Sequence, residues 1–130
     1  MHDVPQTRST LQKKAIDDVF SCVDRPLTVP EVHKAASDLC AGIGIATVYR
    51  AVSRLVSNGT LKDVKIPGQP TRYERVSLYH HHHFHCSICE RVLDVTAPCE
   101  SLDSQLAPGF KADRHELTFY GICADCNQTS

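Results

Sequence analysis

Residues 46–59, ATVYRAVSRLVSNG, decide the fold of the first half of the chain. Their apolar side chains recur at helical spacing and form one stripe. The stripe consists of Val48, Ala51, Val52, Leu55 and Val56. Asn58 and Gly59 readily adopt the left-handed backbone that ends a helix. We therefore expect a helix from Ala46 or Thr47, with Thr47 as a candidate N-cap, to about Asn58.

Two shorter helical segments precede this one. The first, residues 10–23, carries its own apolar stripe, formed by Leu11, Ala15, Ile16, Val19 and Phe20. In the second, Thr28 is suited to be an N-cap, Pro30 to the first turn, and Glu31 to the positive end of a helix. We expect this helix to end near Leu39, before a glycine-containing turn at residues 41–44.

Two strand-like runs follow, at residues 61–66 and 71–76, on either side of Pro67-Gly68-Gln69-Pro70. Three helices followed by a two-stranded hairpin is the order of a winged helix-turn-helix, whose third helix enters the major groove of DNA. An unspecialised small α+β domain is the alternative interpretation. We expect a winged-helix DNA-binding domain in residues 1–78.

The two parts of the 130-residue chain differ in charge. Residues 1–79 contain 11 Lys and Arg against 8 Asp and Glu, whereas residues 80–130 contain 3 against 7. This asymmetry fits a nucleic-acid-binding head joined to a cation-binding body, although ordinary solvated surfaces show similar excesses. Neither a membrane-spanning apolar run nor a secretion leader is apparent, so we expect a cytoplasmic protein without a membrane partner.

We expect residues 79–84 to form a hinge and residues 85–130 a small α/β domain. Strands are predicted around residues 92–95 and 117–122, and a short helix at 102–106. The overall fold class is then α+β. A domain this small needs additional stabilisation, which we expect from a metal ion and from pairing with a second copy in a homodimer.

Two C-x-x-C pairs, Cys86/Cys89 and Cys123/Cys126, have the spacing with which thiolates bind one tetrahedral ion. Four sulfur ligands leave no position for water, which indicates a structural zinc site and not a catalytic one. A redox pair would need a surrounding βαβ pattern, and a zinc deaminase would need a His-x-Glu motif before Pro-Cys-x-x-Cys. Neither pattern is found, so we do not expect an enzyme.

Histidines occupy positions 80–83. Because alternate residues of an extended segment face opposite sides, His81 and His83 are expected to serve one ion, and His80 and His82 another. Imidazole suits zinc, ferrous iron, nickel and copper, and added carboxylates also admit manganese. A solvated polar linker is the alternative. Side chains that are candidates to complete the two ligand sets are Glu74, Asp94, Glu100 and His115.

The chain resembles the ferric uptake regulator (Fur) family of metal-responsive repressors in three blocks. These are GIATVYR at 44–50, the histidine run leading into Cys86-x-x-Cys89, and His115-Glu116-Leu117 to Tyr120-Gly121 before Cys123-x-x-Cys126. Together they extend over nearly the whole chain. The resemblance implies a homodimer that binds palindromic operators in double-stranded DNA when a regulatory metal is loaded.

The resemblance also implies site residues. The implied metal sites are a structural Zn²⁺ at Cys86, Cys89, Cys123 and Cys126, a hinge sensor at Glu74, His81, His83 and Asp94, and a second site at His80, His82, Glu100 and His115. Glu100 requires a one-residue shift, which leaves Cys99, Ser101 and Asp103 as alternatives. The implied DNA-binding residues are Thr47, Tyr49, Arg50 and, on the first helix, Lys14 with Lys13 beside it.

Two positions depart from the family pattern. Pro26 stands where iron-sensing and peroxide-sensing members usually have a histidine, with His33 expected to be a helix-surface residue. Val76 stands where zinc-sensing members have a cysteine. The regulatory metal is therefore expected to be Zn²⁺, Fe²⁺ or Mn²⁺, in a zinc- or iron-responsive repressor of metal homeostasis genes. A peroxide-sensing regulator and a zinc-buffering protein that does not bind DNA are the alternatives.

Overall fold

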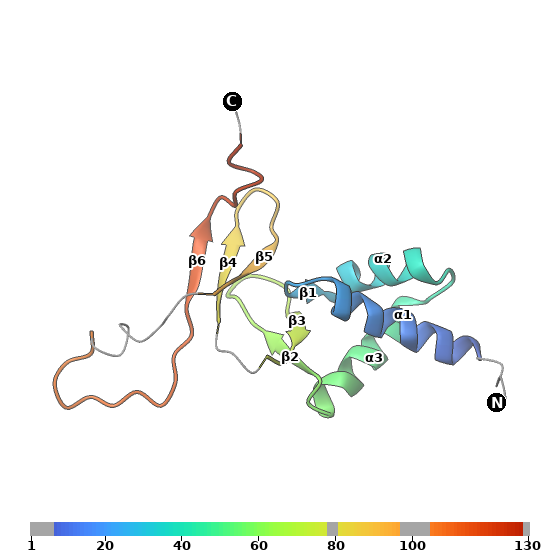
Figure 1. Cartoon of the computed structure of the whole chain (residues 1–130), viewed down its shortest axis with the longest axis horizontal. Helices are drawn as coiled ribbons and strands as arrows, with labels where there is room; N and C mark the ends of the chain where they lie inside the picture. Colours follow the sequence, from blue (N-terminus) through green and yellow to red (C-terminus); the bar gives the residue numbers. More distant parts are fainter. Residues whose placement is uncertain (1–6, 78–80, 97–104, 129–130) are drawn as a thin grey trace. The chain divides into compact units, whose positions relative to one another are not determined.

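The computed structural model describes residues 7–77, 81–96 and 105–128 (Figure 1). The chain divides into two compact units, Met1–Ser77 and Leu78–Ser130, which we describe separately. None of the helices in the described ranges is long and apolar enough to cross a membrane.

Three helices form the framework of the first unit: α1 (Arg8–Cys22), α2 (Val29–Leu39) and α3 (Ile45–Ser57). The predicted start of α2 is confirmed by a capping box. Thr28 Oγ1 accepts from the backbone N–H of Glu31 at 3.3 Å, and Glu31 Oε1 accepts from the backbone N–H of Thr28 at 2.9 Å. Each of these two side chains thereby accepts a hydrogen bond from a backbone N–H group at the start of the helix that would otherwise have no partner.

The start of α3 differs from the prediction, because Gly44 and not Thr47 is its N-cap. The carbonyl of Gly44 accepts from the backbone N–H groups of Thr47 and Val48 at 3.1 and 3.3 Å, so the helix begins at Ile45. Thr47 lies within the first turn, where its Oγ1 accepts from Arg50 at 3.1 Å.

A three-stranded antiparallel sheet completes the first unit, in the order β1 (Leu27–Thr28), β3 (Arg72–Arg75), β2 (Leu61–Val64). The β2–β3 hairpin is the predicted wing, and Gly68 in its turn has a φ of +77°, a backbone conformation that glycine adopts without a Cβ penalty. The two-residue strand β1 was not predicted, because so short a run has no detectable periodicity.

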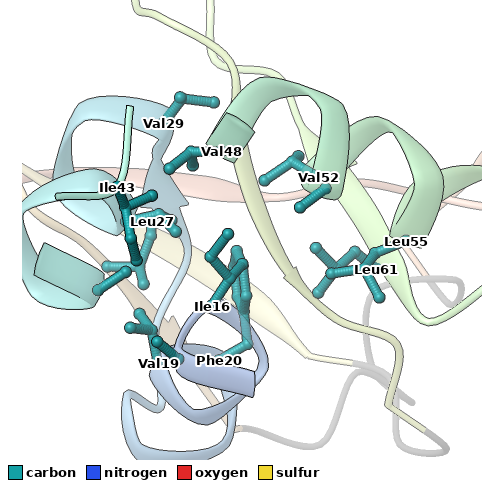
Figure 2. Packing of buried hydrophobic residues seen from close by; sticks show 14 residues of the cluster. Ile16, Val19, Phe20, Leu27, Val29, Ile43, Val48, Val52, Leu55 and Leu61 are labelled. Atoms are coloured by element: carbon teal, nitrogen blue, oxygen red, sulfur yellow. The ribbon is translucent and has the colours of Figure 1, made fainter. Parts of the chain in front are cut away.

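The core of the first unit is formed by the apolar faces of the three helices (Figure 2). Ile16, Val48 and Val52 are almost completely buried, as their places in the predicted stripes require. Fully burying an aliphatic side chain of this kind contributes about 1.5–3 kcal/mol. Because one face of α3 is held in this core, Tyr49 and Arg50 are exposed on the opposite side.

The described part of the second unit contains a sheet in the order β5 (Val92–Val95), β4 (His82–Cys86), β6 (Thr118–Gly121). Strand β4 is antiparallel to β5 and parallel to β6. Residues 82–84, which were predicted to belong to the hinge, are part of β4. The helix predicted at residues 102–106 lies mostly outside the described residues. Helices and sheets together make the α+β fold class that was predicted.

Candidate metal centres

The four predicted thiols of the second unit converge on one point. Their sulfur atoms lie within 4.8 Å of one another, and those of Cys89 and Cys123 are 3.9 Å apart. Pairing of Cys86 with Gly121 across β4 and β6 places the second C-x-x-C pair beside the first. Zinc–sulfur bonds of about 2.3 Å in a tetrahedron require sulfur–sulfur distances of about 3.8 Å. The cluster therefore fits a structural zinc ion.

Backbone amides prepare this cluster for a cation. The N–H groups of Cys123 and Cys89 point at Cys86 Sγ, at 3.4 and 3.5 Å, and lower the pKa of the Cys86 thiol to about 5. A hydrogen bond with the sulfur of Cys123, together with burial, raises the pKa of the Cys126 thiol to about 12. A divalent cation opposes this rise, because it neutralises the thiolates.

Arg91 supplies a positive charge to the same cluster. Its Nε lies 3.3 Å from Cys89 Sγ and its Nη2 lies 3.7 Å from Cys123 Sγ. Nη2 also forms an ion pair with Asp125 at 3.1 Å. These hydrogen bonds raise the pKa of the guanidinium further above its ordinary value. Arg91 therefore joins the two C-x-x-C pairs, a role that sequence reasoning missed.

The turn after Cys89 has a strained residue. Glu90 has a φ of +62°, in the left-handed region that favours glycine, and its backbone N–H donates to the carbonyl of Cys86 at 3.0 Å. This turn brings Cys89 back toward Cys86, which allows the two sulfur atoms to share one ion.

A second group of candidate ligands lies at the other end of the β4–β5 hairpin. His81 Nε2 and His83 Nε2 lie 3.5 and 3.6 Å from the same carboxylate oxygen of Asp94, and the two imidazole rings are 5.1 Å apart. Register explains the arrangement, because His83 is paired with Asp94 and His81 lies two residues before it. Two imidazoles and one carboxylate fit a regulatory divalent ion such as zinc, ferrous iron or manganese.

The other histidine face of β4 is also occupied by a pair of imidazoles. His82 is buried, and its ring lies 5.3 Å from that of His115. His80 and Glu100, the other implied members of this second site, lie outside the described residues. The same holds for the alternatives Cys99, Ser101 and Asp103. Of the four implied ligands of this second site, the structure thus places His82 and His115 close together.

Glu74, the remaining implied sensor ligand, belongs to the first unit. It is buried on β3, and its Oε1 lies 3.5 Å from Lys62 Nζ on β2. The carboxylate of Glu74 thus lies beside a lysine on the neighbouring strand of the same sheet.

The implied DNA-binding residues lie on two helices of the first unit. Tyr49 and Arg50 on α3 and Lys14 on α1 are exposed, whereas Thr47 is partly buried and receives the hydrogen bond of Arg50. Arg54, one helical turn after Arg50, is also exposed. The spacing of four residues places the two arginines on the same side of α3.

Pro26, which stands where some family members have a histidine, and His33, which follows it on α2, differ in their environments. Pro26 is fully buried. His33 is partly buried, and its Nε2 lies 2.7 Å from the carbonyl oxygen of Ile43, to which it donates. The prediction of His33 as a simple surface residue is therefore wrong, because this bond ties α2 to the loop before α3.

Comparisons with known proteins support the same family. Residues 5–120 match the model of the Ferric uptake regulator family. The Ferric uptake regulation protein of Campylobacter jejuni is 31% identical over 100 residues, which make up 75% of this chain and 62% of that protein. The Zinc uptake regulation protein of Mycobacterium tuberculosis is 30% identical over 122 residues, covering 92% of this chain and 94% of that protein.

A solved structure of a zinc-bound manganese uptake regulator resembles the fold closely. It has a TM-score of 0.80 and 26% sequence identity, and the match covers 92% of this chain and 91% of the other. All three of these relatives are regulators and not enzymes, in agreement with a closed four-sulfur site. From the extent of the family match, the chain belongs to the ferric uptake regulator family.

Proposed function

We propose that this protein is a metal-dependent, DNA-binding transcriptional repressor of metal homeostasis genes that responds to zinc or ferrous iron in the cytoplasm. The observation that carries the proposal is the His81–His83–Asp94 cluster, whose candidate ligand atoms lie close enough to share a divalent ion, in a chain that also has a winged-helix unit. Relatives named as ferric and zinc uptake regulators support this assignment. The manganese uptake regulator among the similar structures keeps manganese as a candidate metal.

We assign Glu74 as the fourth ligand of the sensor. Only six residues separate it from His81, so the connecting chain is at most about 25 Å long when extended. A metal ion held jointly by Glu74 and the three ligands of the second unit would restrict this connection. Ordering the hinge in this way converts metal occupancy into a defined geometry of the DNA-binding unit.

We assign the second metal site to the four residues that the family resemblance implies: His80, His82, Glu100 and His115. The proximity of the buried His82 ring to His115 supports it. Because His82 and His83 face opposite sides of β4, this second site and the sensor flank the same strand. Binding at either site therefore fixes the position of β4.

A homodimer is supported by the outer strand of the described sheet. Strand β6 lies at one edge, and Phe119, Tyr120 and Ile122 are exposed there. Exposed apolar side chains on a sheet edge mark a surface for association. Two copies would present two α3 helices, which enter successive major grooves of a palindromic operator when they are about 34 Å apart.

The test is DNA binding as a function of metal. The protein is first treated with a mild chelator that removes the regulatory metal. A DNA fragment from upstream of its own gene is then titrated with this protein, and zinc, ferrous iron or manganese is added in separate experiments under anaerobic conditions. Restored binding with zinc alone at the lowest free concentration identifies a zinc regulator. Restoration by iron or manganese instead identifies an iron or manganese regulator, although Pro26 stands where iron-sensing members usually have a histidine.

The double variant His81→Ala/His83→Ala distinguishes the sensor from other metal effects. It should remain a folded dimer, measured by gel filtration and circular dichroism, and lose metal-dependent binding. A retained metal response in this variant would contradict the sensor assignment. Metal binding without any DNA binding in the parent protein would instead indicate a zinc-buffering protein.

A further inference from the structure

An ion pair on the wing involves the carboxylate that we assign to the sensor. Lys62 on β2 is paired with Glu74 on β3, and its Nζ lies 3.5 Å from Glu74 Oε1. Directly paired residues of an antiparallel sheet project to the same face, so the register itself places the two side chains together. Glu74 therefore has a cation beside it within its own unit.

The two partners of this ion pair differ in their freedom to move. The side chain of Glu74 is 5% exposed, whereas that of Lys62 is 43% exposed. A lysine ammonium is a compact, strongly hydrated charge at the end of a flexible four-carbon stem. Lys62 can thus leave the carboxylate and enter water by rotating its own side chain, without any movement of the backbone.

A second cation on the same face of the sheet does not have this freedom. Arg72 lies two residues before Glu74 on β3, between Thr28 and Val64 of the two neighbouring strands. Residues two apart on a strand share a face, so Arg72 and Glu74 project to the same side. Arg72 is only 4% exposed, which restricts its guanidinium group. Of these two cations, Lys62 is the one that can be displaced.

We propose that Lys62 is an internal competitor of the regulatory metal. Its ammonium group pairs with Glu74 in the metal-free protein and is displaced when a divalent ion binds. The proposal rests on the proposed function, in which Glu74 is the fourth ligand of the sensor. A divalent cation and an ammonium group that share one carboxylate repel each other, so each lowers the affinity of the carboxylate for the other. Lys62 therefore raises the free metal concentration at which the sensor fills.

The exposure of Lys62 limits the strength of this competition. Ion pairs with a solvent-exposed partner are screened and contribute only modestly to stability. Competition of this strength should lower the metal affinity of the sensor about 3- to 10-fold. Because the metal is held by three further ligands, His81, His83 and Asp94, it still displaces the lysine. The competition thus shifts the metal response without preventing it.

The experiment measures the zinc affinity of the full-length protein without DNA, by competition with a fluorescent zinc chelator. The four-cysteine site is kept filled, and the binding step that disappears in His81→Ala/His83→Ala is the one assigned to the sensor. Lys62→Gln removes the charge, and Lys62→Arg keeps it. Lys65→Gln is the matched control, because Lys65 Nζ lies 3.6 Å from Asp63 Oδ2 on the same hairpin and Asp63 is not a proposed ligand.

Lys62→Gln should bind zinc about 3- to 10-fold more tightly than the parent protein, whereas Lys62→Arg and Lys65→Gln should stay within about 2-fold of it. The rise in melting temperature on adding zinc should be larger in Lys62→Gln, because a tighter ligand stabilises the folded state more. In a Glu74→Gln background, Lys62→Gln should have no effect, since no carboxylate remains to compete for. Circular dichroism verifies that each variant is folded.

Three results would overturn the competition. They are unchanged or weaker zinc binding in Lys62→Gln, an equal gain in Lys65→Gln, and a gain in Lys62→Gln that persists in the Glu74→Gln background.

Failure of the proposed function is measured separately. If Glu74→Gln alone binds zinc as tightly as the parent protein, Glu74 is not a sensor ligand, and the competition fails with it. If metal leaves the DNA binding of the parent protein unchanged, the protein is not a metal-dependent repressor, whereas the zinc affinities of the Lys62 variants still decide whether the competition exists.

Discussion

The guanidinium of Arg91 lies within hydrogen-bonding distance of sulfur atoms from both C-x-x-C pairs, 3.3 Å from Cys89 Sγ and 3.7 Å from Cys123 Sγ. A zinc ion with four thiolates carries a net charge of −2, so each sulfur remains electron-rich. Hydrogen bonds from a fixed cation reduce this electron density and hold the ligands in place. The stability of the site therefore depends on a residue that is not itself a ligand.

Arg91→Met is expected to weaken zinc retention about 10- to 100-fold, the range typical for loss of a group that orients metal ligands. Zinc transfer to a chromogenic chelator measures this directly. Arg114→Met is the matched control, since Arg114 is an exposed arginine of the same unit. Equal transfer from both variants would show that Arg91 has no part in zinc retention.

Asp94→Asn tests the carboxylate shared by His81 and His83. The amide keeps the size of the side chain but removes a charge that the metal requires, so regulatory-metal affinity should fall by at least about 10-fold. Isothermal titration with zinc after the four-cysteine site is filled gives the affinity. Asp113→Asn, at an exposed aspartate, should leave it unchanged. Unaltered affinity in Asp94→Asn would remove Asp94 from the sensor.

Glu90→Gly is expected to stabilise the protein, because glycine adopts a φ of +62° without strain. A left-handed backbone conformation costs a non-glycine residue about 1 kcal/mol or more, and the substitution removes this cost. The greater conformational freedom of glycine in the unfolded chain offsets part of that stabilisation. The zinc-loaded variant should show a small rise in melting temperature. A fall would mean that the contacts of the Glu90 side chain outweigh the strain.

Glu31 gives the first unit a pH-dependent stability. Burial raises the pKa of its carboxyl, but hydrogen bonds from Thr28 and Arg25 outweigh this effect and bring the pKa below the ordinary value of 4.5. A group whose pKa is lowered by folding stabilises the protein above its unfolded pKa, and this contribution disappears as pH falls through the folded pKa. The stabilisation should thus be complete at neutral pH.

Glu31→Gln should therefore reduce stability by about 1 kcal/mol at neutral pH, since it removes the ion pair with Arg25 and weakens the capping box. The difference from the parent protein should shrink as pH is lowered from about 5 to about 3. Thermal unfolding at a series of pH values checks this. A difference independent of pH would show that the carboxylate charge makes no contribution.

Local signals predicted most of the first unit. The apolar stripes of residues 10–23 and 46–59 located α1 and α3, and the capping sequence at Thr28 located α2, because each depends on residues close in sequence. The N-cap of α3 was misplaced because Gly44 caps through its backbone alone, without a side-chain hydrogen bond. A side-chain rule cannot detect such a cap.

Contacts between distant segments were less predictable. The C-x-x-C spacing showed that each cysteine pair can bind metal, whereas the position of Cys123 beside Cys86 depends on the parallel pairing of β4 with β6. Arg91 was missed for a similar reason. A lone arginine has no recognisable spacing, and its role depends on the strand that packs beside it.

The run of four histidines before Cys86 leaves the alignment of β4 with its neighbours underdetermined, since a shift by one residue exchanges one histidine for another on each face. Folding intermediates with a shifted β4 would thus retain imidazoles on both faces and could trap metal in the wrong alignment. The side chains that distinguish the native alignment come at the end of the strand: Phe84, whose ring lies against Gly121, and Cys86. Errors in metal loading should therefore arise when the sensor histidines capture an ion before the cysteines have closed on theirs.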